Sequence, residues 1–256
     1  MKKIKHLKKK DGTVEKQSMN LKKLLCLNYL NLTNLTEYSG KYDFPKLYCN
    51  TDVFPDYIAL ENEPGKYRLT DLTCVAFFEY DNEFDGQHGL YNAIYYNNKA
   101  DLAEFKEKYQ GIKFVITPDY SLIGDNDEVE NLYRLKKSRV DGLWFLHEIG
   151  AMVIPLFTFP RIDSMETYIA GLENCSVIAM STKGHMQKTE DYKDLCKAVD
   201  FVVKKIPLKA IVVYDVCGSN DKTLKAFESA IQKGIKIIIP PNTLKIRNEQ
   251  KRRKAK

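Results

Sequence analysis

Residues 210–239, AIVVYDVCGSNDKTLKAFESAIQKGIKIII, decide the fold. The stretch opens on the apolar run Ala210–Tyr214 and closes on a second apolar run, Ile235–Ile239. Between them, apolar residues recur at helical spacing, and Gly234 stands where such a helix ends. A strand, a helix and a second strand in this order predict two parallel strands joined by a right-handed crossover.

Similar apolar runs occur upstream, separated by helical patterns. Most are continuous rather than alternating, which is typical of strands covered on both faces. These runs are Tyr57–Leu60, Cys74–Tyr80, Lys113–Thr117, Met152–Thr158 and Ser176–Met180. The chain is therefore predicted to be an α/β protein with a mainly parallel sheet of about seven strands.

Seven strands fit either a barrel-like (β/α) fold or an open doubly wound sheet. We favour the barrel-like fold, because strand and helix alternate from Cys74 onward without a signal that the strand order reverses. The helical patterns include a long helix over 128–149, which Gly150 is placed to end, and an amphipathic helix that Pro207 stops.

The formal net charge of +6 is unevenly distributed. Residues 1–16 carry seven lysines and two acidic residues, a net charge of +5, and residues 241–256 carry +6. The remaining segment carries 26 basic and 31 acidic residues, a net charge of −5. This pattern excludes a uniformly basic nucleic-acid-binding fold, and it ties any nucleic-acid role to the two ends.

The predicted organisation is one α/β domain over 51–243 with a basic extension on each side. Residues 1–50 are expected to form a mobile basic arm with a short helix. Residues 244–256 are expected to form a mobile basic tail.

The sequence predicts a cytoplasmic protein that does not enter a membrane. No stretch approaches the ~18 apolar residues of a membrane span. The basic start is followed by polar residues 11–16 instead of the apolar core of a signal peptide. The six cysteines are scattered singly with no Cys-x-x-Cys pair, which indicates reduced thiols and no zinc knuckle.

Candidate functional residues follow the predicted strands, because sites in parallel α/β folds form at the carboxyl ends of strands. Asp119 follows Thr117-Pro118 at a rigid strand exit, and we take Asp119, Asp125 and His185 as candidate catalytic residues. Asp119 and Asp81 are candidate ligands for a divalent metal, Mg²⁺ or Mn²⁺. The candidate binding residues are Asp81, Ser121, Arg139, Ser181 and Asp215.

Each of these residues also has a structural interpretation. Asp and Ser at strand ends cap the following helix and turn the chain. Arg139, with its neighbouring lysines, either grips a phosphate or lies on a solvated helix face. A phosphate-binding P-loop, a dinucleotide fingerprint, a nucleophile elbow and a zinc-protease helix are all missing from the sequence, so no nucleotide cofactor is predicted.

Residues 117–122, Thr-Pro-Asp-Tyr-Ser-Leu, together with Asp125, resemble the centre of an uncharacterised bacterial and phage family. That centre reads Ser or Thr, Pro, Asp, Phe or Tyr, Ser, Leu or Ile, two variable positions, Asp, one variable position and Pro. The resemblance extends over roughly 55–217, with departures at Asp127 and Asp215, where the family has Pro and Gly. It implies a phage or mobile-element setting and no established reaction.

Three functional hypotheses remain open from the sequence. The leading one is a nucleic-acid-associated protein that binds through its basic ends. The most compatible chemistry is metal-dependent hydrolysis of a phosphodiester, because this reaction uses clustered carboxylates. The alternative is a non-catalytic factor whose acidic body binds a host protein. Whether the protein is an enzyme is left open.

Overall fold

The computed structural model describes residues 19–254, so the basic segment 1–16 lies outside the described part of the chain. Seven parallel strands are present between residues 57 and 238. They form a four-stranded sheet of order β3-β4-β5-β6 and a three-stranded sheet of order β7-β8-β9. The strands are β3 (Tyr57–Leu60), β4 (Thr73–Ala76), β5 (Phe114–Ile116), β6 (Met152–Ile154), β7 (Val177–Ser181), β8 (Ala210–Tyr214) and β9 (Lys236–Ile238).

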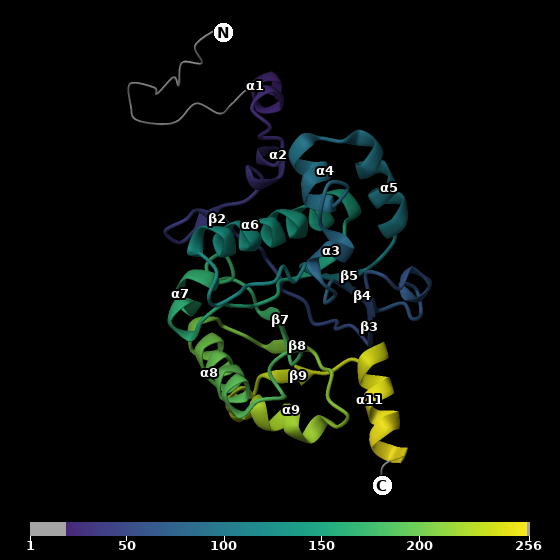
Figure 1. The fold of residues 1–256 in the computed structure, drawn as a ribbon, viewed down its shortest axis with the longest axis vertical. Coiled ribbons are helices and arrows are strands. Elements are labelled where there is room, and N and C mark those ends of the chain that lie inside the picture. Colours follow the sequence, from purple (N-terminus) through teal and green to yellow (C-terminus); the bar gives the residue numbers. More distant parts are fainter. Residues whose placement is uncertain (1–18, 255–256) are drawn as a thin grey trace.

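Helices separate most of these strands, which confirms the predicted α/β class (Figure 1). The main helices after β4 are α3 (Asp81–Phe84), α4 (Leu90–Tyr96), α5 (Lys99–Tyr109), α6 (Glu128–Trp144), α7 (Met165–Tyr168), α8 (Thr189–Lys205), α9 (Asn220–Ala226), α10 (Glu228–Gln232) and α11 (Thr243–Lys254). The chain before β3 forms α1 (Met19–Leu24), α2 (Leu30–Thr33) and the antiparallel pair β1 (Tyr38–Ser39) and β2 (Phe44–Pro45). Short 3₁₀ turns lie at Pro64–Lys66 and Ile162–Ser164. Within residues 19–254, no helix is long and apolar enough to cross a membrane.

The two parallel sheets touch at both of their edges through single bridges. Ile58 of β3 bridges Asn242, which follows β9. Leu156, just after β6, bridges Ala179 of β7. Both bridges are parallel, like the strands that they join, but neither extends into a ladder. The described strands therefore form two sheets with joined edges, and a closed barrel is not shown.

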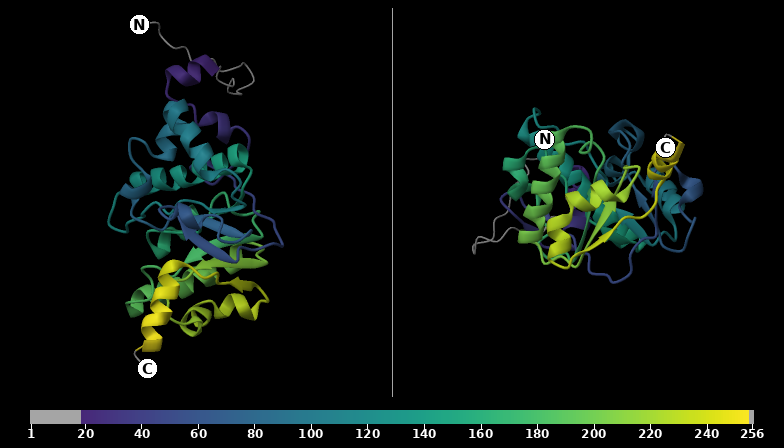
Figure 2. Two further views of the ribbon diagram at one scale, coloured as in Figure 1. Left: turned by 90° about the vertical axis from the view of Figure 1, so that its right-hand side faces the viewer. Right: turned by 90° about the horizontal axis from the view of Figure 1, so that it is seen from below.

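The strands of the four-stranded sheet send alternate side chains into two different cores. In β4, Cys74 and Ala76 belong to a core that also contains the strands β7 and β8 and the helix α8. Val75, between them, belongs to the core beneath α4, α5 and α6. The result is a layered body, with α4 to α6 on one side of the strands and α8 and α9 on the other (Figures 1 and 2).

The helix expected over 128–149 is α6 followed by one π-helical turn, Phe145–Ile149. Asp127 caps its first turn, with its side chain accepting a hydrogen bond from the Glu130 N–H at 2.9 Å. Gly150 ends it at φ 75°, a left-handed conformation that favours glycine. One face of α6 is buried, and it carries side chains toward the loops that follow β4 and β5.

The segment expected to be a mobile arm is partly built into the core. Phe44, Leu47 and Cys49 are buried, and the Leu47 N–H donates to the Gly171 carbonyl at 3.0 Å. The charge-based expectation of mobility therefore does not hold for this part of 1–50. Its apolar residues are too few and too irregularly spaced to predict a helix or strand, yet they fill space beside α6 and α7.

The C-terminal tail, expected to be mobile, is the helix α11. Lys245 of α11 is buried and forms an ion pair with Asp215, which directly follows β8. The Asn248 amide donates to the Val216 carbonyl at 2.7 Å, and Thr243 donates to Glu63 at 2.6 Å. Specific contacts thus hold α11 along one side of the body (Figure 1).

Asp215 is the centre of this attachment. Burial by itself would raise the pKa of its carboxyl group, but hydrogen bonds from Lys245, the Cys217 N–H, Thr182 and Thr223 hold the pKa below its ordinary value. The side chain is ionised and fully satisfied inside the protein. Asp215, a predicted binding residue, therefore fastens α11 to the strand end and leaves no oxygen facing solvent.

Replacing Lys245 tests this attachment. Lys245→Ala leaves the Asp215 carboxylate buried without its cation, and we expect a loss of about 3–5 kcal/mol in the free energy of unfolding. Urea denaturation followed by circular dichroism measures the loss. The control, Lys251→Ala, removes an exposed lysine from the same helix and is expected to change stability by less than about 0.5 kcal/mol. Equal stability of the two variants would contradict a buried ion pair.

Candidate functional site

The loops after β4, β5, β7 and β8 bring several polar side chains together at the carboxyl ends of the strands. Backbone contacts link neighbouring loops within each sheet. The Asp119 N–H, after β5, donates to the Phe77 carbonyl, after β4, at 3.2 Å. The Thr182 N–H, after β7, donates to the Tyr214 carbonyl at the end of β8 at 3.0 Å. We call the group Glu79, Asp119, Lys183 and Tyr214 the strand-end cluster.

Asp119 is the acid of this cluster. Its side chain is half-buried, just beyond the buried Thr117-Pro118 exit of β5. Burial raises the pKa of its carboxyl group to about 7, the ammonium of Lys183 opposes this rise, and the carboxylate of Asp81 adds to it. Asp119 therefore exchanges a proton near neutral pH, which is the property that a general acid or base requires.

Lys183 joins the two sheets at the same edge. It follows β7 and Thr182, and its ammonium donates a hydrogen bond to the carbonyl of Phe78, which follows β4. The ammonium also lies 5.6 Å from the centre of the Tyr80 ring. Its charge acts on both Asp119 and Glu79 and lowers the pKa of each carboxyl group.

Glu79 and Tyr214 contribute two buried polar atoms that have no hydrogen-bond partner within residues 19–254. The Glu79 Oε1 atom accepts from the Asn62 N–H at 3.2 Å, but its Oε2 atom has no donor. The Tyr214 hydroxyl is also unpartnered, and its ring stacks on Phe78 at a centroid distance of 4.1 Å. Burial raises the pKa of Glu79. Unsatisfied groups of this kind are costly, and they mark a place where a ligand or water completes the bonding.

Asp81, a predicted metal ligand, has other partners. Its carboxylate accepts hydrogen bonds from the Ser121 hydroxyl at 2.7 Å and the Ser121 N–H at 3.1 Å. It also forms an ion pair with Arg134 of α6 at 2.6 Å. Asp81 and Ser121 thus hold the loops after β4 and β5 against α6. Within the described part of the chain, no three His, Cys, Asp or Glu side chains are grouped to hold a metal ion.

His185 and Ser181 lie near the end of β7, with different neighbours. The His185 ring packs against Phe159 at a centroid distance of 6.4 Å. Burial lowers the pKa of His185, while Asp191 at the start of α8 opposes this shift. The Ser181 hydroxyl accepts from the Lys183 N–H at 3.0 Å and so shapes the loop that carries Lys183. The electrostatic neighbours of His185 are acids of α8 and do not include Asp119.

Asp125 and Arg139 do not join the strand-end cluster. Asp125 is exposed on the loop between β5 and α6. Arg139 is completely buried, and its Nη2 atom donates to the Tyr168 carbonyl at 3.4 Å. Burial lowers the pKa of Arg139 to about 10. Arg139 therefore does not lie on a solvated helix face, because its face of α6 turns inward, and its Nε and Nη1 atoms have no hydrogen-bond partner within residues 19–254.

Of the strand-end cluster, the sequence analysis assigns a role only to Asp119. Tyr214 was not recognised as a functional residue. Tyr214 ends an apolar run, so its position predicts an ordinary core residue. Its unpartnered hydroxyl is the feature that points to a role in the site. The motif Ser181-Thr182-Lys183-Gly184 offered the signal for Lys183, since a lysine at a strand end suits an anion.

Comparison with known families gives one match. The family described as a domain of unknown function, DUF4417, matches residues 36–231. This range includes every strand except β9, and it includes the whole strand-end cluster. The comparisons found no match among curated proteins and none among solved structures.

The raised pKa of Asp119 makes a testable contribution to stability. Between its ordinary value of 3.8 and about 7, the folded chain binds more protons at this site than the unfolded chain does. Stability therefore falls as the pH rises through this window. Asn cannot ionise, so Asp119→Asn is expected to stabilise the protein by about 1–2 kcal/mol at pH 8 and to have little effect at pH 4.

Urea denaturation at the two pH values measures this difference. Asp125→Asn, on the exposed part of the same loop, is the control and is expected to show no comparable change with pH. A destabilised Asp119→Asn variant at pH 8 would contradict a carboxyl group whose pKa is raised in the folded protein.

Proposed function

The chain belongs to this family of unknown function, and we propose from its site that it is an enzyme that hydrolyses phosphodiesters of nucleic acid. The observation that carries the proposal is Asp119, an acid with a pKa of about 7, in a cluster with the cation Lys183 and two unpartnered buried polar atoms. Acid, cation and unsatisfied polar groups at the carboxyl ends of parallel strands are the components of a catalytic site.

We propose further that the two sheets act as one barrel-like scaffold. Two parallel bridges, at Ile58 with Asn242 and at Leu156 with Ala179, join their edges. Such a scaffold directs all seven strand ends toward one face. Polar groups that are far apart in sequence, such as Asp119 after β5 and Lys183 after β7, then act on a single substrate.

The proposed chemistry is attack of water on the phosphorus atom. The ionised Asp119 carboxylate takes a proton from the water as the new P–O bond forms, and the P–O bond to the leaving oxygen breaks. Lys183 is placed to offset the negative charge that gathers on the phosphate oxygens. The leaving oxygen takes its proton from solvent, and Asp119 releases its proton to solvent before the next turnover.

A divalent metal, Mg²⁺ or Mn²⁺, is part of the proposal as an ion held between substrate and protein. Mg²⁺ is commonly bound by one or two carboxylates together with substrate phosphate oxygens. One oxygen of Asp119 is the ligand that we assign to it, which leaves the other oxygen to take the proton from water. Asp81 is not available, because both of its oxygens already accept hydrogen bonds from Ser121, and one of them also pairs with Arg134. The metal would activate the water and neutralise phosphate charge.

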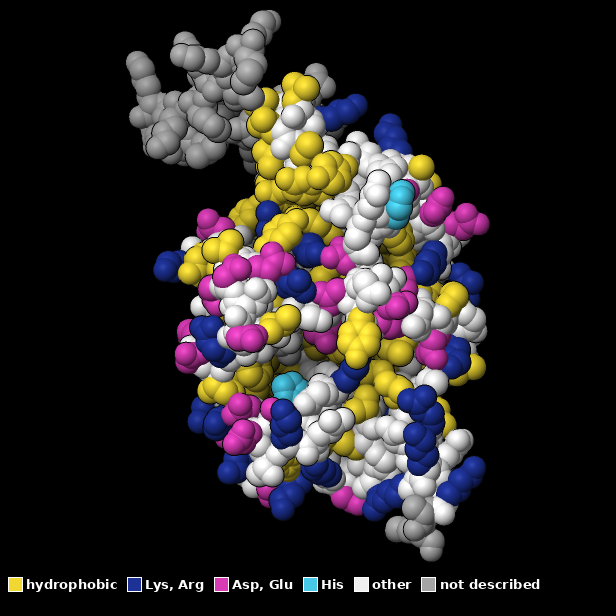
Figure 3. Space-filling model, in the orientation of Figure 1, with side chains coloured by type: hydrophobic (Ala, Val, Ile, Leu, Met, Phe, Trp, Pro, Cys, Tyr) yellow, Lys and Arg dark blue, Asp and Glu magenta, His cyan; other side chains and the backbone are white. Residues whose placement is uncertain are grey.

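Helix α11 supplies the proposed contact with nucleic acid. Its last turn carries Lys251, Arg252, Arg253 and Lys254, all of which are exposed. None of these four side chains forms an ion pair within residues 19–254. Arg252 also lines a surface depression beside the residues that follow β8. In Figure 3, Lys and Arg side chains line α11 at the lower right, while acidic side chains gather near the middle of the same face.

This distribution suits a substrate whose backbone is anionic. Phosphates are attracted to the basic turn of α11, where Arg252 donates a hydrogen bond to the Gly218 carbonyl after β8 at 3.4 Å. The buried Lys245–Asp215 pair holds the first turn of the same helix. The net negative charge of the body disfavours non-specific binding of nucleic acid to the rest of the surface. The phage or mobile-element setting that the family resemblance implies is consistent with such an activity and stays part of the proposal.

Activity assays test the catalytic proposal. Purified protein is incubated with single-stranded DNA, single-stranded RNA and bis(p-nitrophenyl) phosphate, with Mg²⁺, with Mn²⁺ or with a chelator. We expect metal-stimulated hydrolysis, and we expect Asp119→Asn to lower it by about 10²–10⁴-fold. Asp125→Asn is the matched control and is expected to retain activity. Full activity of Asp119→Asn, or no hydrolysis by the wild-type protein with either metal, would refute the proposal.

Binding measurements at several salt concentrations test the role of α11. Replacing Arg252 and Arg253 by Gln removes two phosphate contacts. Affinity for DNA or RNA should fall for every sequence, and the slope of log affinity against log salt should become shallower by about 2. The control replaces two exposed lysines outside α11, Lys193 of α8 and Lys233 just after α10, by Gln. If both pairs of substitutions change the slope equally, the binding is not specific to α11.

A further inference from the structure

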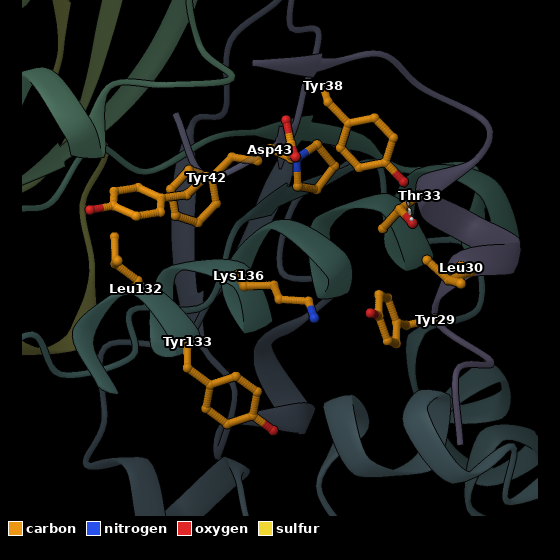
Figure 4. Close-up of a pocket in the computed structure, with 11 residues that line it drawn as sticks. Tyr29, Leu30, Thr33, Tyr38, Tyr42, Asp43, Leu132, Tyr133 and Lys136 are labelled. Carbon is orange, nitrogen blue, oxygen red and sulfur yellow. Dashed lines mark hydrogen bonds between the residues drawn. The ribbon is translucent and has the colours of Figure 1, made fainter. Parts of the chain in front are cut away.

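A cavity lies between the first described segments of the chain and α6, and no residue of the strand-end cluster lines it. It has a volume of about 470 Å³, which is within the range of small-molecule sites. Its walls come from α2, from the β1–β2 pair and from the first half of α6 (Figure 4). The lining residues are Tyr29, Leu30, Thr33, Tyr38, Tyr42, Asp43, Phe44, Pro45, Leu132, Tyr133 and Lys136.

Tyrosines dominate this cavity, and contacts fix the orientation of several of them. The Tyr38 hydroxyl donates to Thr33 at 3.0 Å. The Tyr133 ring packs edge-on against Tyr91 at a centroid distance of 5.7 Å, and the Tyr42 ring packs edge-on against Phe44 at 6.5 Å. These rings are partly exposed, although large apolar surface usually turns inward. Aromatic walls held in this way suit a planar ring as a ligand.

Lys136 places a positive charge in the middle of these walls. In Figure 4, its side chain reaches from α6 toward Tyr29, and its ammonium lies 4.0 Å from the centre of the Tyr29 ring. The lysine is half-buried and has no carboxylate partner within residues 19–254. Asp43 also lines the cavity but forms no ion pair with Lys136. The other lysine of α6, Lys137, differs in this respect, since it pairs with Asp85.

We infer that this cavity binds a small aromatic anion, with the ring of the ligand between the tyrosine walls and its acidic group on Lys136. A half-buried cation without an anionic partner is stabilised by a ligand that brings the anion. The aromatic walls select a flat apolar body over an extended aliphatic one. Nucleoside monophosphates and aromatic carboxylates share this chemistry, and the experiment separates the two sources.

Isothermal titration calorimetry on the full chain tests the inference. The probes are the four common nucleoside 5′-monophosphates, indole-3-acetate and phenylacetate, with the nucleosides and indole as uncharged counterparts. At least one anion is expected to bind more tightly than its uncharged counterpart by about tenfold, because hydrogen bonds to a charged group are worth roughly 1.5–3 kcal/mol. The probe that binds identifies the phosphate or the carboxylate class.

Variants assign the binding to this cavity. Lys136→Gln is expected to weaken binding of the anion by about tenfold, and Lys136→Arg is expected to retain it, since the cation is kept. Tyr133→Leu should weaken binding of the charged and uncharged probes alike. The control, Lys193→Gln, changes an exposed lysine on α8 and should have no effect.

The same titration distinguishes this cavity from the proposed nucleic-acid surface. The Arg252→Gln, Arg253→Gln double variant should bind the aromatic anion as the wild-type protein does. If no probe binds at about 10 mM, or if Lys136→Gln binds as tightly as Lys136→Arg, the inference is overturned. Loss of binding in the α11 double variant alone would likewise overturn it, because the anion would then occupy the other surface.

Discussion

The ammonium of Lys183 is the interaction on which the strand-end face depends. It extends from the loop after β7, in one sheet, to the Phe78 carbonyl after β4, in the other. From that position its charge acts on Asp119 and Glu79 together. Without this cation, two half-buried carboxyl groups would lie at the same edge with no positive charge between the sheets. The same lysine therefore joins the two sheets and lowers the pKa values of the two carboxyl groups.

The surrounding structure holds this face in place through polar contacts of a different kind. Asp81 is saturated by Ser121 and Arg134, and it ties two strand-end loops to α6. Asp215 is saturated by its own partners and ties α11 to β8. The strand-end cluster, by contrast, keeps polar atoms without partners. Asp81 and Asp215 thus belong to the frame, whereas Glu79 and Tyr214 each keep one buried polar atom without a hydrogen-bond partner within residues 19–254.

The sequence was sufficient to predict the class of fold and most of its elements. Continuous apolar runs predicted the parallel strands, and helical periodicity with Gly150 predicted the end of the long helix at α6. Asp119 was predicted as a site residue because a rigid Thr-Pro exit places it at a strand end. The joining of the two sheets at their edges was not predictable, because it rests on single bridges such as Leu156 with Ala179, which leave no periodic pattern.

The failures have a common physical origin, which is a charged residue whose partner lies far away in sequence. The sequence predicts that Lys245 belongs to a solvated tail, but Lys245 is buried in an ion pair with Asp215. One interpretation of the sequence places Arg139 on a solvated helix face, but that face is turned toward Tyr168. Local patterns describe which residues are charged and how often they recur. They do not reveal the long-range contact that offsets the free-energy cost of burying a charge.

The most direct test of this account is the acidity of Asp119 itself. A ¹³C NMR titration of its side-chain carboxyl group, in the wild-type protein and in Lys183→Met, measures the pKa in both. The account predicts a pKa near 7 in the wild-type protein and a higher value in Lys183→Met, because the cation that opposes the shift is removed. A wild-type pKa near the ordinary 3.8, or the same pKa in both proteins, would contradict it.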